Sequence, residues 1–315
     1  MEPKKIFEPQ NRLWLPPTEL EVLGTGGFDW TLHRVRLEHG PLFISVSGTQ
    51  TPRVQLGRVG YSNGVLVRGD FPADSVLLVH QRRKVHAVYH NREVAGAEVV
   101  FSREGDEVDF IMREGDDVYT IAVEADFFKE MFVELFGETA LKQASRSRRL
   151  RLKQTCQNRF AAKVESWIFQ LHEGRLQKEG VPYDVIEKVM LRELLECIDT
   201  VKVSRERKRF GIEQVREALE ENLENTVTIP EIAQRLGIGK RQLYGAFKER
   251  YGMSPKKYLR MLRLDAIRKE LAVADGSVKV SDVALKYGFL HLGHFAAEYK
   301  KVFGKSPSET LNRGF

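Results

Sequence analysis

The chain has few cysteines and no long apolar run. Its 315 residues include only two cysteines, Cys156 and Cys197, which excludes a disulfide framework and a cysteine-rich zinc module. No apolar run approaches the roughly eighteen residues of a membrane-spanning helix, and the first ten residues lack the apolar core of a signal peptide. We therefore expect a soluble, cytoplasmic protein that does not meet the membrane.

Motifs of catalysis are also missing. There is no glycine-rich phosphate loop, nucleophile elbow or Cys/His arrangement. His80, His86 and His90 stand alone, with no His-X-His pair of the kind that metal-binding β-barrels use. Scattered histidines are more often packed or surface residues than ligands. The sequence predicts no metal site, no cofactor and no enzyme.

Positive charge is concentrated in the last third of the chain. The formal net charge is +6. Residues 205–315 hold 22 Lys and Arg against 14 Asp and Glu, whereas residues 1–204 hold 28 against 30. A basic excess confined to one segment is typical of a region that meets a polyanion.

That basic segment contains one stretch twice. "IGKRQLYGAFKERYGMSP" at residues 238–255 and "HLGHFAAEYKKVFGKSP" at residues 291–307 align with an offset of 52. Upstream, Ala233 and Ala284 align with an offset of 51, so the second copy carries one extra residue after its glycine. The matched positions share residue type: Leu243 with Phe295, Lys248 with Lys300, Gly252 with Gly304, Ser254 with Ser306 and Pro255 with Pro307.

Each copy is predicted to form two helices joined by a tight turn. In the first copy, Thr228 and Glu231 have the spacing of a capping box, and Gly237 suits the left-handed end of that helix. A second helix is expected from about Lys240 to Tyr251. In the second copy we expect Ser281 or Asp282 at the helix start, Gly288 at the turn, and a buried face made of Phe295, Tyr299 and Phe303.

The connection between the copies is itself helical in pattern. Residues 255–272, "PKKYLRMLRLDAIRKELA", begin with a Ser-Pro start signal. A helix of this length spans about 27 Å, while neighbouring major-groove windows on one DNA face lie about 34 Å apart. A rigid connector of this kind could place both second helices in consecutive windows.

These residues resemble a known family. Residues 209–315 are similar to the DNA-binding domain of AraC-type (AraC/XylS) bacterial transcription regulators, through "IPEIAQRLGIGKRQLYGAFKERYGMSPKKYLRMLRL" and "VSDVALKYGFLHLGHFAAEYKKVFGKSP". The resemblance covers about a third of the chain. It implies a tandem helix-turn-helix domain that binds double-stranded DNA beside a promoter, with RNA polymerase as a partner.

The resemblance and the expected exposed faces together suggest the residues that contact DNA. Arg241 could pair bidentately with guanine, whereas Gly245 offers no side chain. Glu298 lies close to the second set, so the second helix is expected to recognise sequence weakly. Candidate base contacts are Arg241, Gln242, Tyr244, Leu292 and His294, and candidate phosphate contacts are Lys240, Lys248, Lys256, Lys257, His291 and Lys300.

The first part of the chain is predicted to be rich in β-strands. "PLFISVSG" and "GVLVRG" are strand candidates, and "REGD" occurs at residues 103–106 and 113–116 between three further strand-like runs. A helix with Asp126 as its cap should follow. By domain order this part resembles the cupin-like sensory domains of AraC-type proteins. A barrel interior would suit a small effector, and its candidate lining residues are Trp30, Arg34, His86, Tyr89 and His90.

The middle of the chain contains a basic run and two amphipathic patterns. Residues 142–153, "KQASRSRRLRLK", suggest a solvated hinge or an anionic contact. Helices near 160–171 and 183–198 would pack on the barrel, or alternatively form a homodimer. The predicted fold class is α+β multidomain: a β-rich effector-binding domain at 1–141, a helical connector at 142–204 and a tandem helix-turn-helix domain at 205–315.

The favoured function is a sequence-specific transcription regulator, more often an activator, controlled by a small effector. One alternative replaces the effector with a protein partner. Another makes the N-terminal part an enzyme fused to a regulator, but both cysteines lie outside the β-rich region, where a methyl-accepting cysteine cluster would be expected.

Overall fold

The structure is a computed structural model, and it describes residues 5–19, 26–27, 30–81, 88–89, 92–93, 96–199, 212–224, 228–274 and 278–312. The chain divides into two compact units, one comprising residues 1–34, 42–62 and 67–206 and the other residues 35–41, 63–66 and 207–315. Within the described residues, no helix combines the length and the apolar character needed to cross a membrane.

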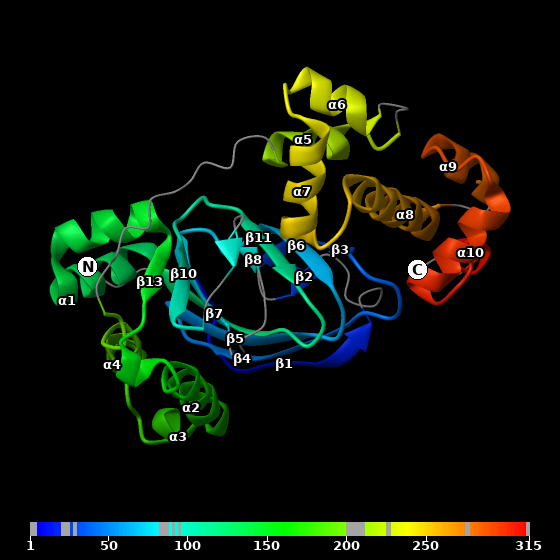
Figure 1. Ribbon diagram of the computed structural model, residues 1–315. Coiled ribbons are helices and arrows are strands. Elements are labelled where there is room, and N and C mark those ends of the chain that lie inside the picture. Colours follow the sequence, from blue (N-terminus) through cyan, green and yellow to red (C-terminus); the bar gives the residue numbers. More distant parts are fainter. Residues whose placement is uncertain are drawn as a thin grey trace. The chain divides into compact units, whose positions relative to one another are not determined.

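The first unit contains two sheets (Figure 1). One has the strand order β1-β4-β5-β12-β7-β10-β13 and the other β2-β3-β6-β11-β8-β9. The strands are β1 Gln10–Glu19, β2 Gly26–Gly27, β3 Trp30–Arg36, β4 Phe43–Gln50, β5 Val54–Tyr61, β6 Val65–Asp70, β7 Ser75–Gln81, β8 Val88–Tyr89, β9 Arg92–Glu93, β10 Glu98–Ser102, β11 Val108–Met112, β12 Asp117–Glu124 and β13 Arg149–Arg151.

The three strand-like runs around the two "REGD" segments are confirmed as β10, β11 and β12. In both turns the fourth residue's N–H donates to the first residue's carbonyl at 3.0 Å, and the glycines have φ of +77° and +75°. The chain nevertheless alternates between the sheets at each turn, because β10 and β12 belong to the seven-stranded sheet and β11 to the other. Neither turn therefore closes a hairpin.

Alternation along a strand separates two environments. On β12, Tyr119, Ile121 and Val123 belong to the apolar core that includes the helices. Val118 and Thr120, which alternate with them, line a cavity between the two sheets. Successive side chains of a strand point to opposite faces, so the seven-stranded sheet carries a helix-packed face and a cavity face.

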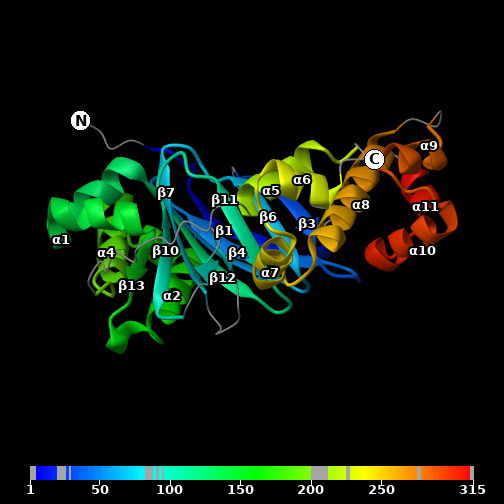
Figure 2. The same cartoon turned by 45° about the horizontal axis from the view of Figure 1, so that its top comes forward.

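Helices α1 Ala125–Ser147, α2 Phe160–Glu173, α3 Arg175–Lys178 and α4 Tyr183–Leu195 follow β12, with a short 3₁₀ helix at Gln154–Cys156. In Figures 1 and 2, α1, α2 and α4 gather on one side of the strands. Buried residues of these three helices share one core with β5, β7, β10 and β12. The two amphipathic helices therefore pack on the seven-stranded sheet, in agreement with the first of the two predicted alternatives.

Two local predictions in this unit are wrong. The cap of α1 is Glu124, whose carboxylate accepts from the N–H groups of Asp126 at 3.2 Å and Phe127 at 2.7 Å, because its longer side chain reaches back from the preceding strand. The basic run at residues 142–153 is not a hinge. It forms the last turns of α1 and then β13, which pairs with β10.

A buried ion pair connects α4 to Arg53, which directly precedes β5. Glu187 accepts from the Arg53 backbone N–H at 2.7 Å and from Arg53 Nε at 2.6 Å. The two side chains are only 1 % and 8 % exposed, and the guanidinium carbon lies 3.7 Å from the centre of the Phe127 ring. No sequence pattern pairs residues 134 positions apart, so this contact could not be predicted.

The second unit is helical in its described parts after residue 212. Its helices are α5 Ile212–Glu221, α6 Ile229–Arg235, α7 Lys240–Tyr251, α8 Pro255–Val273, α9 Val280–Lys286, α10 Leu292–Phe303 and α11 Pro307–Leu311. The predicted helix at 240–251 is confirmed with the same bounds, and the predicted connector helix is one residue longer than expected.

Candidate nucleic-acid interface and ligand cavity

Helices α6 and α7 form the first pair. The Thr228 hydroxyl accepts from the Glu231 N–H, and the Glu231 carboxylate accepts from the Thr228 N–H at 2.7 Å, so the predicted capping box is confirmed. Gly237 has φ +66° at the turn. Leu243, Phe247 and Tyr251 of α7 are buried, which fixes the orientation of the opposite face of α7.

That opposite face brings the predicted contact residues together. Lys240, Arg241, Gln242 and Lys248 are exposed, and Tyr244 is half-buried. The Lys240 ammonium lies 6.0 Å from the centre of the Tyr244 ring. Within the described part of the chain, Lys240, Arg241 and Lys248 have no ion-pair partner, so their charges remain available to an external anion.

Helices α9 and α10 form the second pair, with Gly288 at φ +79° between them. The expected cap at Ser281 or Asp282 is wrong. The helix begins one residue earlier, and its cap residue Lys279 makes no side-chain capping bond. The Ser281 hydroxyl donates instead to the Asp282 carboxylate at 3.2 Å.

The exposed face of α10 is less polar than that of α7. It carries His291, Leu292, His294 and Lys300, and the rings of the two histidines are 6.3 Å apart between centroids. Leu290, just before the helix, is 75 % exposed. It was missed from the sequence because it belongs to the turn rather than to the helix pattern.

Glu298 is held away from the exposed face by an ion pair. Arg260 of α8 donates through Nε to both carboxylate oxygens, at 2.7 and 2.6 Å. The Arg260 guanidinium also lies 4.8 Å from the centre of the Phe289 ring. The acidic side chain that the sequence places near the second contact face is therefore paired within the unit.

Helix α8 contacts the two pairs through separate sets of buried side chains. Tyr258 packs on Phe247 and Tyr251, with centroid distances of 5.6 and 4.5 Å. Further along, Met261, Leu264, Ile267 and Leu271 share a buried cluster with residues of α9 and α10. Lys256 and Lys257 are exposed in its first turn, where the Ser254 hydroxyl accepts from the Lys257 N–H at 3.3 Å.

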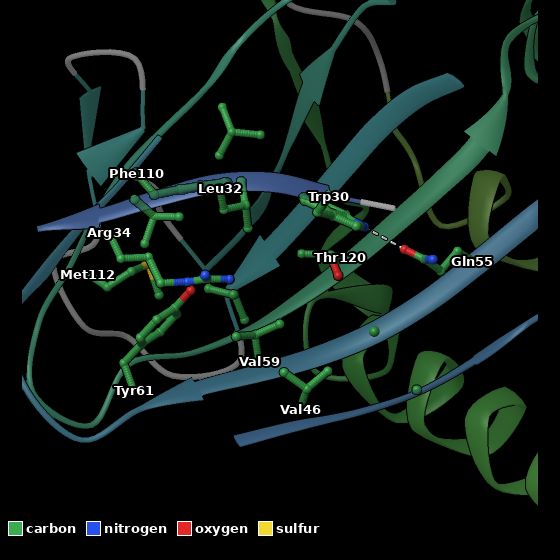
Figure 3. Close-up of a pocket in the computed structure, with 15 residues that line it drawn as sticks. Trp30, Leu32, Arg34, Val46, Gln55, Val59, Tyr61, Phe110, Met112 and Thr120 are labelled. Atoms are coloured by element: carbon green, nitrogen blue, oxygen red, sulfur yellow. Dashed lines mark hydrogen bonds between the residues drawn. The ribbon is translucent and has the colours of Figure 1, made fainter. Parts of the chain in front are cut away.

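The first unit contains a partly open cavity of about 70 Å³ between its sheets (Figure 3). Of the predicted effector-binding residues, Trp30 and Arg34 line it. The other lining residues are Leu32, Val46, Gly48, Gln55, Gly57, Val59, Tyr61, Val67, Val108, Phe110, Met112, Val118 and Thr120.

The cavity is apolar with a few fixed polar groups. Trp30 Nε1 donates to Gln55 Oε1 at 2.6 Å, and the Arg34 guanidinium lies beside the Tyr61 hydroxyl in Figure 3. Burial raises the pKa of Tyr61, and Arg34 opposes that shift. A Cβ at Gly57 would lie 2.6 Å from the Thr120 hydroxyl oxygen, so any larger residue at this position would force the Thr120 side chain to shift.

The remaining candidates lie elsewhere. The Tyr89 hydroxyl hydrogen bonds to the Ser102 hydroxyl, and Tyr89 does not line the cavity. His86 and His90 lie outside the described residues. His80 is buried, and its Nδ1 lies 3.1 Å from the Glu98 carbonyl oxygen. Burial lowers the pKa of His80 despite that bond, so it is a core histidine.

Among the described residues, no group of three or more His, Cys, Asp or Glu could hold a metal ion.

The two cysteines, distant in sequence, lie close together. The Lys153 N–H donates to the Cys197 carbonyl at 2.9 Å, and the Cys156 N–H donates to the Lys153 carbonyl at 2.8 Å. Both thiols are free.

Comparison with known proteins places the helical unit in a family. A family model described as "Helix-turn-helix domain" matches residues 232–313. XylDLEGF operon transcriptional activator 2 of Pseudomonas putida is 34% identical over 129 residues, which cover 40% of this chain and 82% of that protein. HTH-type transcriptional activator RhaS of Yersinia pestis (strain Pestoides F) is 35% identical over 96 residues, covering 30% of this chain and 34% of the relative.

A longer Pseudomonas putida protein, XylDLEGF operon transcriptional activator, is 36% identical over 129 residues, which cover 40% of each chain. The match thus spans about 40% of the length of the first curated relatives. Among solved structures, a probable AraC family transcriptional regulator from Rhodopseudomonas palustris CGA009 is 36% identical, with a TM-score of 0.31, over 32% of this chain and 94% of that one. Since most of the shorter Pseudomonas relative is matched at 34% identity, this chain belongs to the AraC/XylS family of transcriptional regulators.

Proposed function

We propose that this chain is a transcription regulator that binds specific double-stranded DNA through α7 and α10. The observation that carries the proposal is that both helices bury one face against α8 or its neighbours and expose the other. The exposed face of α7 holds three cations without ion-pair partners in the described residues. A helix with this division suits the major groove, where side chains meet base edges and phosphates.

In this proposal α7 is the stronger reader. Arg241 pairs bidentately with guanine, while Gln242 and Tyr244 contact neighbouring base edges. Lys240 and Lys248, at the two ends of the same face, meet phosphates and set the register of the helix.

In the same proposal, α10 reads more weakly. Leu292 and the newly located Leu290 contact thymine methyl groups, and His294 donates to a base. His291 and Lys300 lie toward phosphates. The ion pair of Glu298 with Arg260 keeps a negative charge from facing the DNA backbone. Helix α10 can therefore bind the backbone closely even if it discriminates weakly between base sequences.

Helix α8 sets the distance between the two readers. Its 19 residues span about 28 Å at 1.5 Å per residue, close to the roughly 34 Å between consecutive groove windows. Its N-terminus adds a site for phosphate, since Lys256 and Lys257 are exposed where the helix dipole favours an anion.

We further propose that the cavity binds a small effector and that the first unit acts as a cupin-like sensory domain. An apolar lining with a few fixed polar groups is typical of small-molecule sites, and the volume of about 70 Å³ restricts the effector to a very small molecule. Activation through RNA polymerase is proposed because the Pseudomonas and Yersinia relatives are described as activators. Effector binding would then shift the population of DNA-binding arrangements.

The connector helices offer a dimer surface. Val185 and Val189 lie one turn apart on α4 and are each 46 % exposed, and Phe169 of α2 is 59 % exposed. Exposed apolar side chains of this size are a feature of interaction surfaces. A homodimer formed there would pair two tandem readers on repeated sites.

Selection of binding sequences from random DNA with the full chain, at two salt concentrations, tests the DNA proposal. The expected result is a motif of two half-sites about ten base pairs apart whose affinity falls steeply with salt. Failure to enrich any sequence would refute specific reading. A doubled direct repeat would support the dimer.

A cavity-filling variant tests the effector proposal. Val59→Trp fills the cavity, while Val273→Trp makes the same change on a side chain that is 84 % exposed. Small molecules that raise the melting temperature of the wild type should stabilise the Val273 variant equally and the Val59 variant not at all. Stabilisation of both variants alike would place the ligand elsewhere, and a co-purifying protein would favour control by a partner.

A further inference from the structure

Two sequence motifs without a role in DNA reading meet in space. The first "REGD" turn and the basic run of residues 142–153 together line a pocket outside the barrel cavity. Its volume is about 540 Å³, and it is open to solvent. We call it the basic pocket, and its lining residues are Arg103, Leu141, Lys142, Ser145, Arg146 and Arg148.

Helix periodicity explains one wall of the basic pocket. Lys142 and Arg146 are four residues apart near the end of α1, as are Leu141 and Ser145, so each pair lies on one face of the helix. Arg148 is the C-terminal cap residue, held at φ +53° in the left-handed region while its N–H donates to the Ala144 carbonyl at 2.9 Å. This conformation is unusual for a residue with a side chain, and it ends the helix beside the "REGD" turn.

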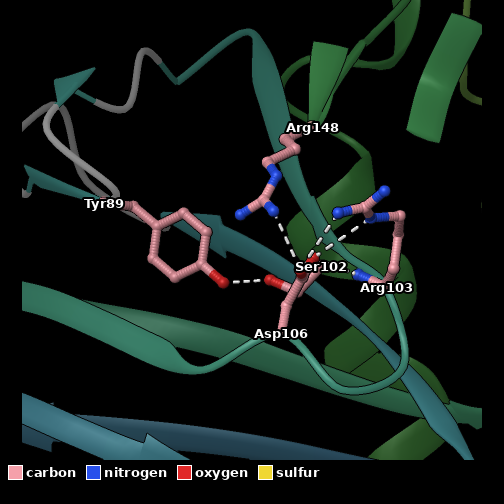
Figure 4. Close-up of polar contacts among 5 residues, drawn as sticks. All are labelled: Tyr89, Ser102, Arg103, Asp106 and Arg148. Carbon is pink, nitrogen blue, oxygen red and sulfur yellow. Dashed lines mark hydrogen bonds and ion pairs between the residues drawn. The ribbon is translucent and has the colours of Figure 1, made fainter. Parts of the chain in front are cut away.

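Asp106 fixes the other two cations. It accepts from the Arg103 N–H at 2.8 Å, from Arg148 Nη2 at 2.8 Å and from Arg103 Nη2 at 3.3 Å (Figure 4). Burial raises the pKa of Asp106, but the hydrogen bonds and charge of Arg103 and the charge of Arg148 outweigh it, and the net shift is downward. The carboxylate stays ionised and holds the two guanidinium groups side by side.

The charge of the basic pocket is not balanced by its own residues. Four cationic side chains line it, and Asp106, the carboxylate that pairs with them among the described residues, is not part of the lining. Lys142 and Arg146 are exposed and have no ion-pair partner among the described residues. The carbonyls at the end of α1 offset only part of this charge, since a helix terminus carries about half an elementary charge.

The second "REGD" turn shows that the arrangement does not follow from the motif alone. Arg113 and Asp116 repeat the same turn, but there Asp116 accepts from Gln81 Nε2 at 3.1 Å and is 1 % exposed. Only the first turn lies next to a cation from the end of α1. The basic pocket is therefore a product of the fold.

We propose that the basic pocket binds a phosphate-bearing small molecule of the diphosphate or nucleotide class. Arginines placed side by side match the geometry of phosphate oxygens, Ser145 supplies a hydroxyl, and Leu141 supplies an apolar surface for the rest of the ligand. The volume lies in the range of small-molecule sites. A concave pocket favours such a ligand over the backbone of duplex DNA. The proposal goes beyond the DNA reader and the barrel cavity, with which the basic pocket shares no residue.

Calorimetric titration of the full chain with inorganic pyrophosphate tests the proposal, with ATP and orthophosphate as further probes. The double variant Lys142→Gln/Arg146→Gln should bind pyrophosphate at least tenfold more weakly, because it removes the two lining cations that have no ion-pair partner in the described part of the chain. Lys129→Gln, an exposed lysine near the start of the same helix, is the matched control and should bind like the wild type. Tighter binding of ATP than of pyrophosphate would identify the nucleotide class.

Three results would overturn the proposal. One is the absence of saturable heat from any of the probes. Another is equal weakening in the Lys129 variant, which would show a general effect of charge. The third is unchanged pyrophosphate binding in the double variant together with weaker binding of a random DNA duplex, which would make these cations contacts to a nucleic-acid backbone. Far-ultraviolet circular dichroism of each variant confirms that it is folded.

Discussion

Residues of the same charge have different proposed roles in this molecule because their side chains and surroundings differ. Arg241 and Lys248 are both exposed cations of α7 without ion-pair partners in the described residues. Their chemistry gives them different proposed roles, because a planar guanidinium offers two N–H donors that match guanine O6 and N7, whereas a lysine ammonium acts mainly as a point charge.

For Arg241→Ala we expect a loss of about 1–3 kcal/mol of binding free energy on the selected site and little change on random DNA. For Lys248→Ala we expect a uniform loss on all sequences and a shallower salt dependence. Fluorescence anisotropy with both DNAs at several salt concentrations measures this. Equal losses of Arg241→Ala on specific and random DNA would contradict base reading by Arg241.

Glu187 and Glu134 provide a second contrast between similar residues. Glu187 pairs with Arg53 in the core, while Glu134 pairs with Arg192 where both side chains are about half exposed. Removing one member of a buried pair leaves an unpaired charge, so Glu187→Ala should lower the free energy of unfolding by about 3–5 kcal/mol. Glu134→Ala should cost less than about 1 kcal/mol. Urea unfolding of both variants measures the two losses of free energy of unfolding. Losses of similar size would contradict the buried position of the Glu187–Arg53 pair.

Cys197 should give a pH dependence. Burial, together with the neighbouring Cys156, raises the pKa of its thiol to about 12, against about 8.5 in an unfolded chain. A pKa raised on folding adds stability that is complete below the unfolded value and is lost as pH rises toward the folded one. Stability should therefore fall from about pH 8.5 upward, and less so in Cys197→Ala. Unfolding curves at pH 7.5 and 10 measure the difference, and parallel curves for both proteins would contradict it.

At the scale of the element, the two helix pairs differ at their starts. Helix α6 has a complete capping box, whereas α9 has no side-chain cap. Thr228→Ala should destabilise α6 by about 1 kcal/mol. Ser281→Ala is the matched change in the second pair and should have almost no effect. Amide hydrogen exchange in the first turn of each helix reports this, and faster exchange in α9 than in α6 after these substitutions would be inconsistent with the capping geometry.

The elements also show what the sequence could and could not reveal. The bounds of α7 followed from Gly252 and the spacing of Leu243, Phe247 and Tyr251, because helix signals are local. The strands β10, β11 and β12 could also be predicted from the sequence. Their alternation between two sheets could not, because the strands that pair are remote in sequence. For the same reason the sequence identified Trp30 and Arg34 as candidates but not the face they share with Val59 or Thr120.

At the scale of the whole molecule, α8 packs against both helix pairs of the helical unit and so holds α7 and α10 at a fixed separation. If α7 and α10 enter consecutive groove windows, the distance between their half-sites cannot vary. Adding five base pairs between the half-sites turns one of them to the opposite side of the duplex, because a helical turn is about ten base pairs. Affinity should fall to that of a single half-site. Electrophoretic mobility shift with insertions of one to ten base pairs measures this, and tolerance of a five-pair insertion would show that the readers move independently.

The division of β12 into a helix-packed face and a cavity face has an evolutionary consequence. Changes at Val118 or Thr120 alter the cavity, whereas changes at Tyr119, Ile121 or Val123 alter the core. If the cavity binds an effector as proposed, substitutions on its face of the strand would change ligand preference, while the alternate residues keep the core intact. The inducing compound could then change during evolution with little effect on folding.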